Sequence, residues 1–304
     1  AGSREKKQMK TLEMLLREGT EILETAEIGE ARLDAWLLLE YITGKNRAYY
    51  YAHMDQETEE GQEKAYLKLC RKRAEHIPLQ HLTGTACFMG YDFFVDERVL
   101  VPRQDTEILV EEALNLLKKT EKPRILDMCT GSGCILLSIL KEIPEAEGTG
   151  ADLSEGALQV AEKNVRKLGL DHRAVLVHSD LFSGEYFSET SGKTQREYDM
   201  LVSNPPYIPT GEIETLMDEV RTHDPYMALD GKEDGLYFYR RITEECRKYL
   251  KPGGWLVYEI GWDQGQAVTG IMENAGFEQV TVKKDLAGLD RVVLGQNPRT
   301  KIFA

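Results

Sequence analysis

Cysteine is scarce in this 304-residue sequence, and its few positions form no pattern that would hold a metal or a disulfide framework. The six histidines are scattered and show no H-E-x-x-H arrangement. We therefore expect no metal cofactor, and we interpret the thiols as free or buried ones of a reducing cytoplasm. The five cysteines, none of which belongs to a C-x-x-C pair, are Cys70, Cys87, Cys129, Cys134 and Cys246.

Long apolar runs are absent as well. No stretch approaches the roughly 20 apolar residues that a membrane-spanning helix needs. The first residues, Ala1-Gly2-Ser3, are interpreted as a cloning remnant, and charged residues follow them instead of the apolar core of a signal peptide. We expect a cytoplasmic protein that makes no membrane contact.

Positive charge is in short supply. The chain has 38 Lys and Arg against 52 Asp and Glu, a net charge of −14. Residues 1–85 are nearly balanced, with 13 basic against 15 acidic, whereas residues 86–304 have 25 against 37. Because phosphate neutralisation dominates affinity for nucleic acids, this acidic part argues against DNA or RNA as a direct partner.

Residues 1–85 show a helical pattern. Apolar side chains recur at helical spacing, as they do from Leu33 to Tyr41, and glycines punctuate the segment. We expect a small bundle of four or five helices. One of them carries a basic cluster, either a solvated face or a docking patch for a partner, formed by Lys64, Lys68, Arg71, Lys72 and Arg73.

The segment 86–100 is expected to link the bundle to the rest of the chain as a hairpin, because Phe88 to Val95 alternates around Gly90. From residue 101 to residue 304, strands alternate with helices, which predicts a doubly wound α/β domain. Asp105 and Thr106 are expected to cap a helix that begins at Glu107.

A glycine turn follows the strand predicted at 124–128, and an apolar helix follows the turn. A strand, a glycine turn and a helix N-terminus form a nucleotide-type site in doubly wound folds. Glycines allow the tight bend and the close approach of a ligand to the backbone. The turn consists of Cys129, Thr130, Gly131, Ser132 and Gly133.

Polar residues end four successive strands. Asp127, Asp152, Asp180 and Asn204 are separated by 25, 28 and 24 residues, and each interval is about one strand–helix unit. The carboxyl ends of parallel strands meet at one edge of the sheet, where open α/β sheets bind ligands. We therefore expect these four side chains to surround one site.

The glycine turn favours S-adenosylmethionine over a dinucleotide. Its T-G-S-G sequence lacks the third glycine of G-x-G-x-x-G, whose helix binds a pyrophosphate. Asp152 is expected to accept hydrogen bonds from both ribose hydroxyls. Asp180 is expected to bind the adenine amine, and Leu181 to cover the ring. The alternative is that these acids only cap helices.

Asn204-Pro205-Pro206-Tyr207 is the most specific motif in the chain. The two prolines fix φ and remove two N–H donors, which holds the loop rigid and leaves its carbonyls free. The side-chain oxygen of Asn204 and the carbonyl of Pro205 can then each accept one N–H of a planar NH2 group, and Tyr207 can stack on that group. This arrangement predicts methyl transfer to an amide or amine nitrogen, driven mainly by positioning.

The rest of the chain completes the predicted sheet. We expect a helix at 235–249, a strand at 255–260, and a final hairpin from 277–282 and 291–294 that adds one antiparallel strand. The segment Ile208 to Gly231 is a long insertion beside the N-P-P-Y motif, and we expect it to form a wall of the acceptor site. The polar stretch Ser188 to Glu197 is predicted to be a surface loop.

The chain resembles the HemK/PrmC family of protein N5-glutamine methyltransferases. N-P-P-Y alone is shared with adenine N6-methyltransferases, so the P-R-x-D-T-E segment and the helical domain carry the resemblance. One departure is Cys129, which replaces the family's usual glycine and matters only if this position needs a positive φ. The matching segments are His81 to Gly84, Val101 to Glu107, Asp127 to Gly133, Ser203 to Tyr207, Gly261-Trp262 and Asp290 to Val292.

This resemblance implies a Rossmann-like class I methyltransferase domain at 101–304 with a seven-stranded sheet, and a release-factor docking bundle at 1–85. It implies methylation of the glutamine in the Gly-Gly-Gln motif of class I peptide chain release factors, with S-adenosylhomocysteine as the second product. Asn204, Pro205, Pro206 and Tyr207 would hold the glutamine. We expect a monomer. The alternatives are adenine N6 methylation of DNA or RNA, and a binding module without activity.

Overall fold

The computed structural model describes residues 9–188 and 197–299. The chain divides into two compact units, Ala1–Gly84 and Thr85–Ala304. Each unit has its own hydrophobic core, so each is described separately.

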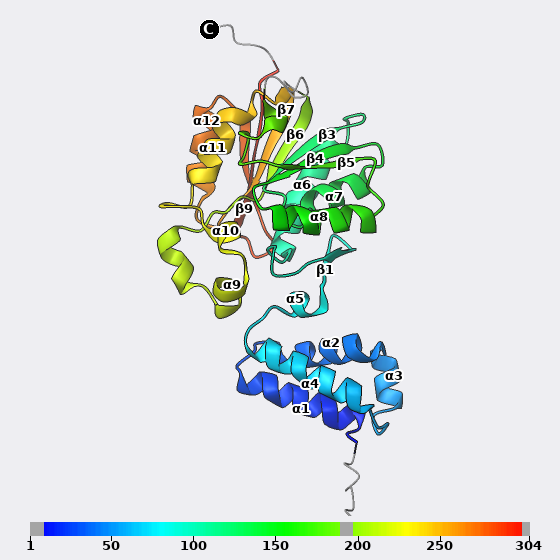
Figure 1. Cartoon of the computed structure of the whole chain (residues 1–304). Helices are drawn as coiled ribbons and strands as arrows, with labels where there is room; N and C mark the ends of the chain where they lie inside the picture. Colours follow the sequence, from blue (N-terminus) through cyan, green and yellow to red (C-terminus); the bar gives the residue numbers. More distant parts are fainter. Residues whose placement is uncertain (1–8, 189–196, 300–304) are drawn as a thin grey trace, which may run out of the picture. The chain divides into compact units, whose positions relative to one another are not determined.

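The first unit is a bundle of helices, as the pattern predicts. Its core gathers Leu15, Trp36 and Leu39 around Tyr66, whose hydroxyl donates to the carbonyl of Ala35. Gly19 allows Tyr66 to approach, because a Cβ there would lie 2.1 Å from the tyrosine oxygen. The helices are α1 (Leu12–Thr25), α2 (Ala31–Thr43), α3 (Arg47–Ala52), α4 (Glu60–Ala74) and α5 (Leu79–Thr83) (Figure 1).

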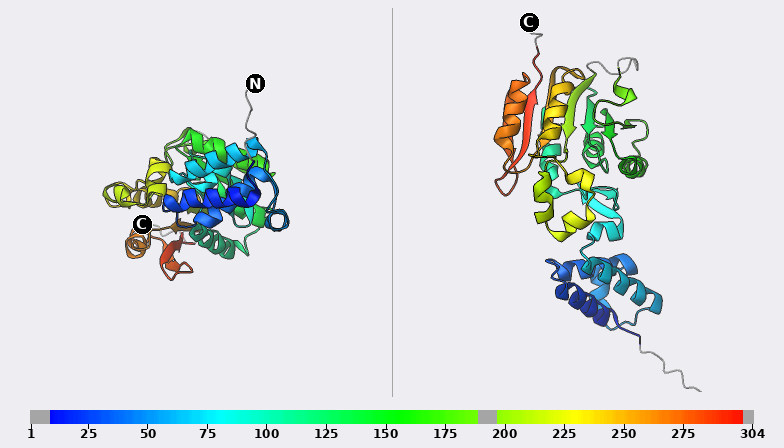
Figure 2. Two further views of the ribbon diagram at one scale, coloured as in Figure 1. Left: turned by 90° about the horizontal axis from the view of Figure 1, so that it is seen from below. Right: turned by 60° about the vertical axis from the view of Figure 1, so that its left-hand side comes forward.

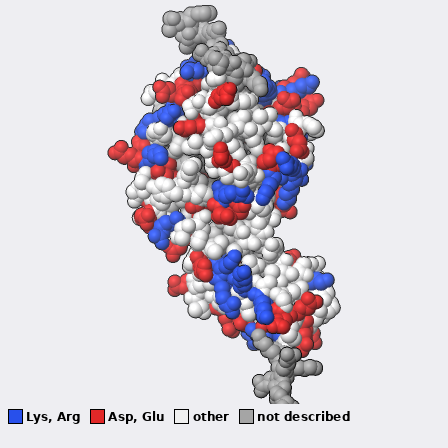
Figure 3. Space-filling view, in the orientation of Figure 1, with Lys and Arg blue, Asp and Glu red and all other residues white. Residues whose placement is uncertain are grey.

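The basic cluster expected on this unit loses one member. Arg73 is buried, and its Nε donates to Asp34 over 2.8 Å, so this pair belongs to the core. The physical reason is the helical period, which turns Arg73 toward α2 and leaves its neighbours outside. Four exposed cations remain on α4, and Figure 3 shows basic side chains gathered on this unit; the four are Lys64, Lys68, Arg71 and Lys72.

The second unit begins with a hairpin of β1 (Thr85–Phe88) and β2 (Tyr91–Phe94). The hairpin is formed as expected, but it is not a mere linker. Phe88 and Phe93 are fully buried in the core of the second unit, together with residues of α6 (Glu107–Leu117) and α7 (Cys134–Glu142). These two aromatic side chains hold the hairpin on the domain, because burying their apolar surface is more favourable than leaving it exposed to water.

A seven-stranded sheet forms the centre of the second unit, in the order β5-β4-β3-β6-β7-β9-β8. The pairings from β5 to β7 are parallel, and β9 runs antiparallel to both of its neighbours, which confirms one antiparallel strand. The strands are β3 (Arg124–Met128), β4 (Glu147–Asp152), β5 (Ala174–His178), β6 (Tyr198–Ser203), β7 (Leu250–Glu259), β8 (Glu278–Lys284) and β9 (Asp290–Gln296).

Helices cover both faces of this sheet (Figures 1 and 2). Ile125 of β3 packs on one face with α6, α7 and α8 (Glu155–Lys167), and its neighbour Leu126 packs on the other face with α11 (Tyr237–Cys246) and α12 (Gly265–Asn274). This alternation is the period of two that a strand covered on both faces requires.

Three details differ from the sequence-based expectation. Thr106 makes no capping hydrogen bond to α6, because its hydroxyl donates to Glu259 of β7 instead. Strand β7 begins at Leu250, five residues earlier than expected, and passes through a bulge opposite β6. The insertion contains short helices, a 3-10 turn at Thr210–Thr215, α9 (Asp218–His223) and α10 (Tyr226–Leu229). Most of the expected loop from Ser188 to Glu197 lies outside the described residues.

Candidate active site

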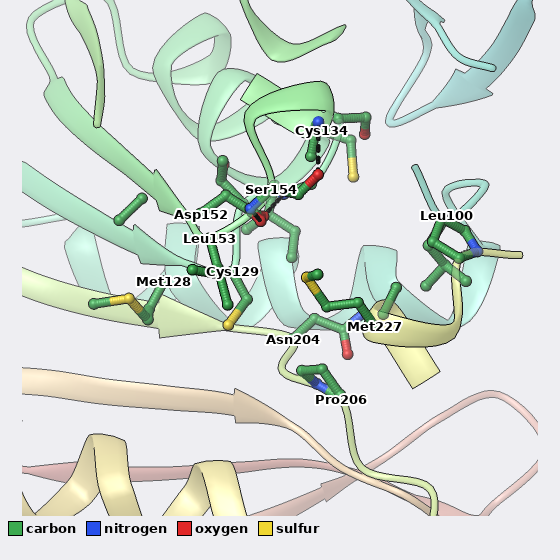
Figure 4. A pocket seen from close by; sticks show the side chains of 18 of the residues that line it. Leu100, Met128, Cys129, Cys134, Asp152, Leu153, Ser154, Asn204, Pro206 and Met227 are labelled. Carbon is green, nitrogen blue, oxygen red and sulfur yellow. Dashed lines mark hydrogen bonds between the residues drawn. The ribbon is translucent and has the colours of Figure 1, made fainter. Parts of the chain in front are cut away.

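A cavity of about 390 Å³ lies at the carboxyl ends of β3, β4 and β6. Its size is typical of a small-molecule site. The glycine turn and Asp152 form one end, and Asn204 with the insertion forms the other (Figure 4). The cavity brings together most of the predicted site residues, namely Cys129, Thr130, Gly131, Ser132, Asp152, Asp180, Leu181, Asn204 and Pro206; Gly133, Pro205 and Tyr207 do not line it.

The glycine turn alternates between left-handed and ordinary backbone conformations. Cys129, Gly131 and Gly133 have φ of +64°, +56° and +82°. Thr130 fixes the bend, since its hydroxyl donates to Asp127 over 2.7 Å and its N–H donates to the carbonyl of Ala151. The turn therefore presents backbone toward the cavity in a shape that side chains disfavour.

Cys129 occupies a position that needs a positive φ. The departure from the family's glycine thus carries a cost, because a left-handed conformation is disfavoured by roughly 1–2 kcal/mol for a residue with a Cβ. Burial, together with the carboxylates of Asp152 and Asp127, raises the pKa of this thiol well above its usual value. The thiol therefore stays protonated and is a poor nucleophile.

Asp152 connects the glycine turn to the start of α8. Its Oδ2 accepts the N–H of Gly131 over 2.9 Å, and its Oδ1 accepts the N–H of Ser154 over the same distance. Each oxygen keeps a further lone pair for a ligand in the cavity. Burial raises the pKa of Asp152, and these backbone N–H groups act against that rise. The alternative role of helix capping falls to Ser154, whose hydroxyl accepts from Ala157.

Asp180 and Leu181 follow β5 and reach the same cavity. Asp180 is exposed at its wall, whereas Leu181 is buried with a left-handed backbone, at φ +51°. The hydroxyl of Ser179 stabilises this conformation by donating to the carbonyl of Leu181 over 2.5 Å. A polar and an apolar group are thereby placed side by side, which suits a flat heteroaromatic ring with an exocyclic amine.

The N-P-P-Y segment leaves β6 at the cavity. Asn204 and Pro206 line the cavity, and Figure 4 shows them near Met227 of the insertion. Pro205 is buried, and the ring of Tyr207 packs against the core on the α11 side of the sheet. Burial and the nearby carboxylate of Glu259 raise the pKa of Tyr207, so its hydroxyl stays protonated. Stacking of this ring on an acceptor remains a prediction.

Three residues outside the recognised motifs fix the position of the N-P-P-Y segment. Gln264 Nε2 donates to the carbonyl of Tyr207 over 2.9 Å. Gly231 and Gly235 pack so close that a Cβ on either would lie 2.4–2.9 Å from backbone atoms of Tyr207. Glycine itself was the available signal at both positions, because it allows the close approach of two backbone segments.

The segment Arg103 to Glu107 connects four parts of the domain. Arg103 forms an ion pair with Asp224 of the insertion at 3.4 Å, and Asp105 forms one with Arg291 of β9 at 3.5 Å. The Thr106 hydroxyl donates to Glu259, whose pKa is raised by burial. The carboxylate of Glu107 accepts the N–H of Met89 in the hairpin over 2.8 Å. These four side chains account for the P-R-x-D-T-E sequence.

The cavity offers carboxylate acceptors to a polar ligand. Asp152 and Asp180 line it, whereas Asp127 is buried beneath the glycine turn, where it accepts from the Thr130 hydroxyl and burial raises its pKa to about 7. A ribose diol donates hydrogen bonds to carboxylates, and S-adenosylmethionine carries such a diol. Among the described residues, the helices are too short or too polar to span a membrane. The same residues contain no group of three or more His, Cys, Asp or Glu side chains that could hold a metal ion.

The fold and this cavity define a class I methyltransferase, which takes its methyl group from S-adenosylmethionine. Residues 14–84 match the PrmC N-terminal domain, and residues 104–222 match the Methyltransferase small domain. Among solved structures, the hMettl16 catalytic domain in complex with the MAT2A 3′UTR hairpin 6 has the same fold, with a TM-score of 0.54 and 15% identity. The match covers 77% of this chain and 83% of that one.

Curated relatives are similar along most of their length. A release factor glutamine methyltransferase of Clostridium acetobutylicum is 41% identical over 86% of this chain and 90% of its own. That of Caulobacter vibrioides is also 41% identical, over 91% and 93%. The chain belongs to the release factor glutamine methyltransferase family.

Proposed function

We propose that this enzyme transfers a methyl group from S-adenosylmethionine to the side-chain amide nitrogen of a glutamine in class I peptide chain release factors. The acceptor is the glutamine of their Gly-Gly-Gln motif, and S-adenosylhomocysteine is the second product. The observation that carries the proposal is that Asn204 and Pro206 of the N-P-P-Y segment line the same cavity as the glycine turn, in a chain of this family.

The cofactor end of the cavity would bind the donor through groups already held in place. Asp152 would accept from the ribose hydroxyls, since the N–H groups of Gly131 and Ser154 orient both of its oxygens. Asp180 would accept from the adenine amine, and Leu181 would cover the ring. The backbone of the turn from Cys129 to Gly133 would lie against the amino-acid portion, where Gly131 leaves open space.

The acceptor end would orient the amide. The Asn204 side-chain oxygen and the Pro205 carbonyl would accept the two N–H groups, so that the nitrogen points toward the donor methyl. S-adenosylmethionine supplies an already activated methyl cation equivalent, so positioning is the main requirement. Tyr207 anchors the loop through its carbonyl, and its ring is proposed to reach the amide face when the acceptor enters.

A labelling experiment tests this function. The enzyme is incubated with methyl-labelled S-adenosylmethionine and, in parallel, with a release factor, the same factor with its motif glutamine replaced by Ala, and duplex DNA. Label on the wild-type factor alone, assigned by mass spectrometry to the glutamine amide, is the expected result. Label on adenine in DNA, or equal label on the Ala variant, would contradict the proposal.

The helical unit is proposed to dock the release factor. A single inserted side chain provides little affinity, so a second contact is needed to select one protein loop. The exposed cations on α4 would supply it, mainly by raising the association rate. We expect Lys68→Glu combined with Lys72→Glu to raise KM for the intact factor and its salt sensitivity, while leaving KM for a short glutamine peptide unchanged. An unchanged KM for the intact factor would refute this docking surface.

Four further properties complete the proposal. The enzyme would act as a monomer in the cytoplasm, where its translation-factor substrate is found. It would need no metal, since the donor methyl is already activated. It would touch no nucleic acid directly, because the methyltransferase part is strongly acidic.

A further inference from the structure

An arginine with free donors stands at the acceptor end of the cavity. Arg103 lines the cavity together with Asn204 and Pro206, and its side chain is 48% exposed. A guanidinium has five N–H donors. Within the described ranges, Arg103 uses one of them, in a single long hydrogen bond of 3.4 Å to Asp224.

The other arginine at the cavity wall shows the contrast. Arg98 is bonded to both carboxylate oxygens of Asp96 and also to Gln159, so most of its donors are used within the protein. Arg103 therefore has N–H donors at the cavity that no residue of the described ranges accepts.

The partner of Arg103 is itself incompletely bonded. The Asp224 side chain is 6% exposed, and its buried Oδ1 has no hydrogen-bond partner among the residues that the structure describes. A buried polar atom without a hydrogen bond destabilises the fold, so its presence in a native protein calls for a functional explanation. Asp224 directly precedes Pro225 to Ala228, four residues that line the cavity, so the ion pair positions the arginine beside this part of the insertion.

The proposed acceptor has a matching need. When the glutamine side chain enters the cavity, the peptide backbone on both sides of it stays at the mouth. Two glycines precede this glutamine and offer no side chain, so an enzyme can recognise them only through their carbonyl and N–H groups. A planar guanidinium with several parallel donors is well suited to bind carbonyl oxygens.

We propose that Arg103 binds the backbone carbonyls of the glutamine-bearing loop and is a specificity-determining residue for the acceptor, with Asp224 as its positioning residue. This inference rests on the proposed function. It assigns to the P-R-x-D-T-E sequence a direct role in substrate binding, beside the structural contacts of its other residues.

The test compares two acceptors, an intact release factor and a short peptide that spans the Gly-Gly-Gln motif. We expect Arg103→Ala to raise KM about 10- to 100-fold for both, since a hydrogen bond to a charged group is worth roughly 1.5–3 kcal/mol. The cofactor Kd should stay unchanged, and kcat should change less than threefold. Arg103→Lys should recover part of the loss, because it keeps the charge but not the fork. Arg221→Ala, which removes an exposed cation of the same insertion, is the matched control.

The outcomes distinguish a failure of the proposed function from a failure of the role assigned to Arg103. If wild-type enzyme labels no glutamine, the proposed function fails. The inference is overturned if the wild-type enzyme labels glutamine but Arg103→Ala leaves both KM values unchanged, or lowers kcat and cofactor affinity instead. Arg103 would then have only a structural role, through its ion pair with Asp224. Arg103→Gln, which keeps the length of the side chain, decides the question by the same KM criterion if the Ala variant does not fold.

Discussion

Gln264 donates a hydrogen bond from its side-chain amide to the backbone carbonyl of Tyr207, over 2.9 Å and across 57 residues of sequence. The Oε1 atom of the same side chain accepts the N–H of Gly261 over 2.8 Å. Gln264 thus fixes the end of the N-P-P-Y segment to the loop after β7. The two prolines make this segment rigid, and a residue distant in sequence adds to that rigidity.

We expect Gln264→Ala to lower kcat about tenfold. The part-buried carbonyl of Tyr207 would lose its partner, which costs roughly 1 kcal/mol and allows the loop to move. Cofactor affinity should stay within twofold, because the residue lies outside the cofactor end. Steady-state kinetics with titration calorimetry would check this, and Gln266→Ala on the exposed side of the same helix is the control. A normal kcat would show that the prolines alone suffice.

Asn204→Ala should reduce turnover far more than it reduces cofactor binding. It removes an acceptor for the amide N–H but no proposed contact to the donor, so we expect a fall in kcat of at least about 100-fold, on the scale of a lost positioning contact. Single-turnover kinetics and calorimetry on the same preparation provide the comparison. Equal losses in both would mean that Asn204 mainly holds the cofactor.

Asp152→Ala should weaken cofactor binding about 10- to 100-fold. Two hydroxyl groups would lose a charged acceptor, at roughly 1.5–3 kcal/mol, and Gly131 would lose the partner of its N–H. Calorimetry with S-adenosylhomocysteine measures the change directly. Asp171→Ala, at an exposed turn, is the control for loss of one negative charge. Unchanged affinity would refute the ribose assignment.

Cys129→Gly should stabilise the protein by about 1 kcal/mol. Glycine adopts the φ of +64° without the strain that a Cβ causes, although it also gains entropy in the unfolded chain. Cys129→Ala removes the thiol but keeps the Cβ, so it should bring no such gain. Urea unfolding of the three proteins separates the two effects. A gain in the Ala variant equal to that of the Gly variant would show that the buried thiol, not the backbone, is the source.

Asp224 predicts a pH-dependent stability difference. Burial raises its pKa from 3.8 to about 6, so the folded protein binds this proton more tightly than the unfolded chain does. Ionising the buried Asp224 carboxyl lowers the free energy of unfolding. This loss is absent below about pH 4, grows as the pH rises, and is complete above about pH 6. Asp224→Asn should increase the free energy of unfolding at pH 8 by about 1–3 kcal/mol and change little at pH 4. An equal effect of Asp224→Asn at pH 4 and at pH 8 would contradict this assignment.

The sequence predicts the strands and the cavity well because both depend on local patterns. The strand at 124–128 has the predicted bounds, and the regular spacing of the polar residues that end successive strands places Asp152, Asp180 and Asn204 at one cavity. Alternation of apolar faces and glycine turns is written in short stretches of sequence, so no knowledge of distant contacts is needed.

Long-range polar contacts could not be predicted in the same way. Thr106 has the sequence context of a helix cap, but its hydroxyl is bonded to Glu259, 153 residues later. Arg73 belongs to a basic run, yet it is buried with Asp34. In both cases the partner is set by tertiary packing. The positive φ of Cys129 was indicated only by the glycine that the family usually has there, because cysteine itself argues against such a φ.

The bonds of Arg103 to Glu107 have a consequence for how this gene can vary. Neighbouring residues of one turn each reach a different element, at Asp224, Arg291, Glu259 and Met89. A substitution removes one of these contacts, whereas a one-residue insertion or deletion would shift every side chain past its partner at once. This short segment should therefore tolerate single substitutions better than insertions or deletions. Its length should stay fixed wherever the activity is retained.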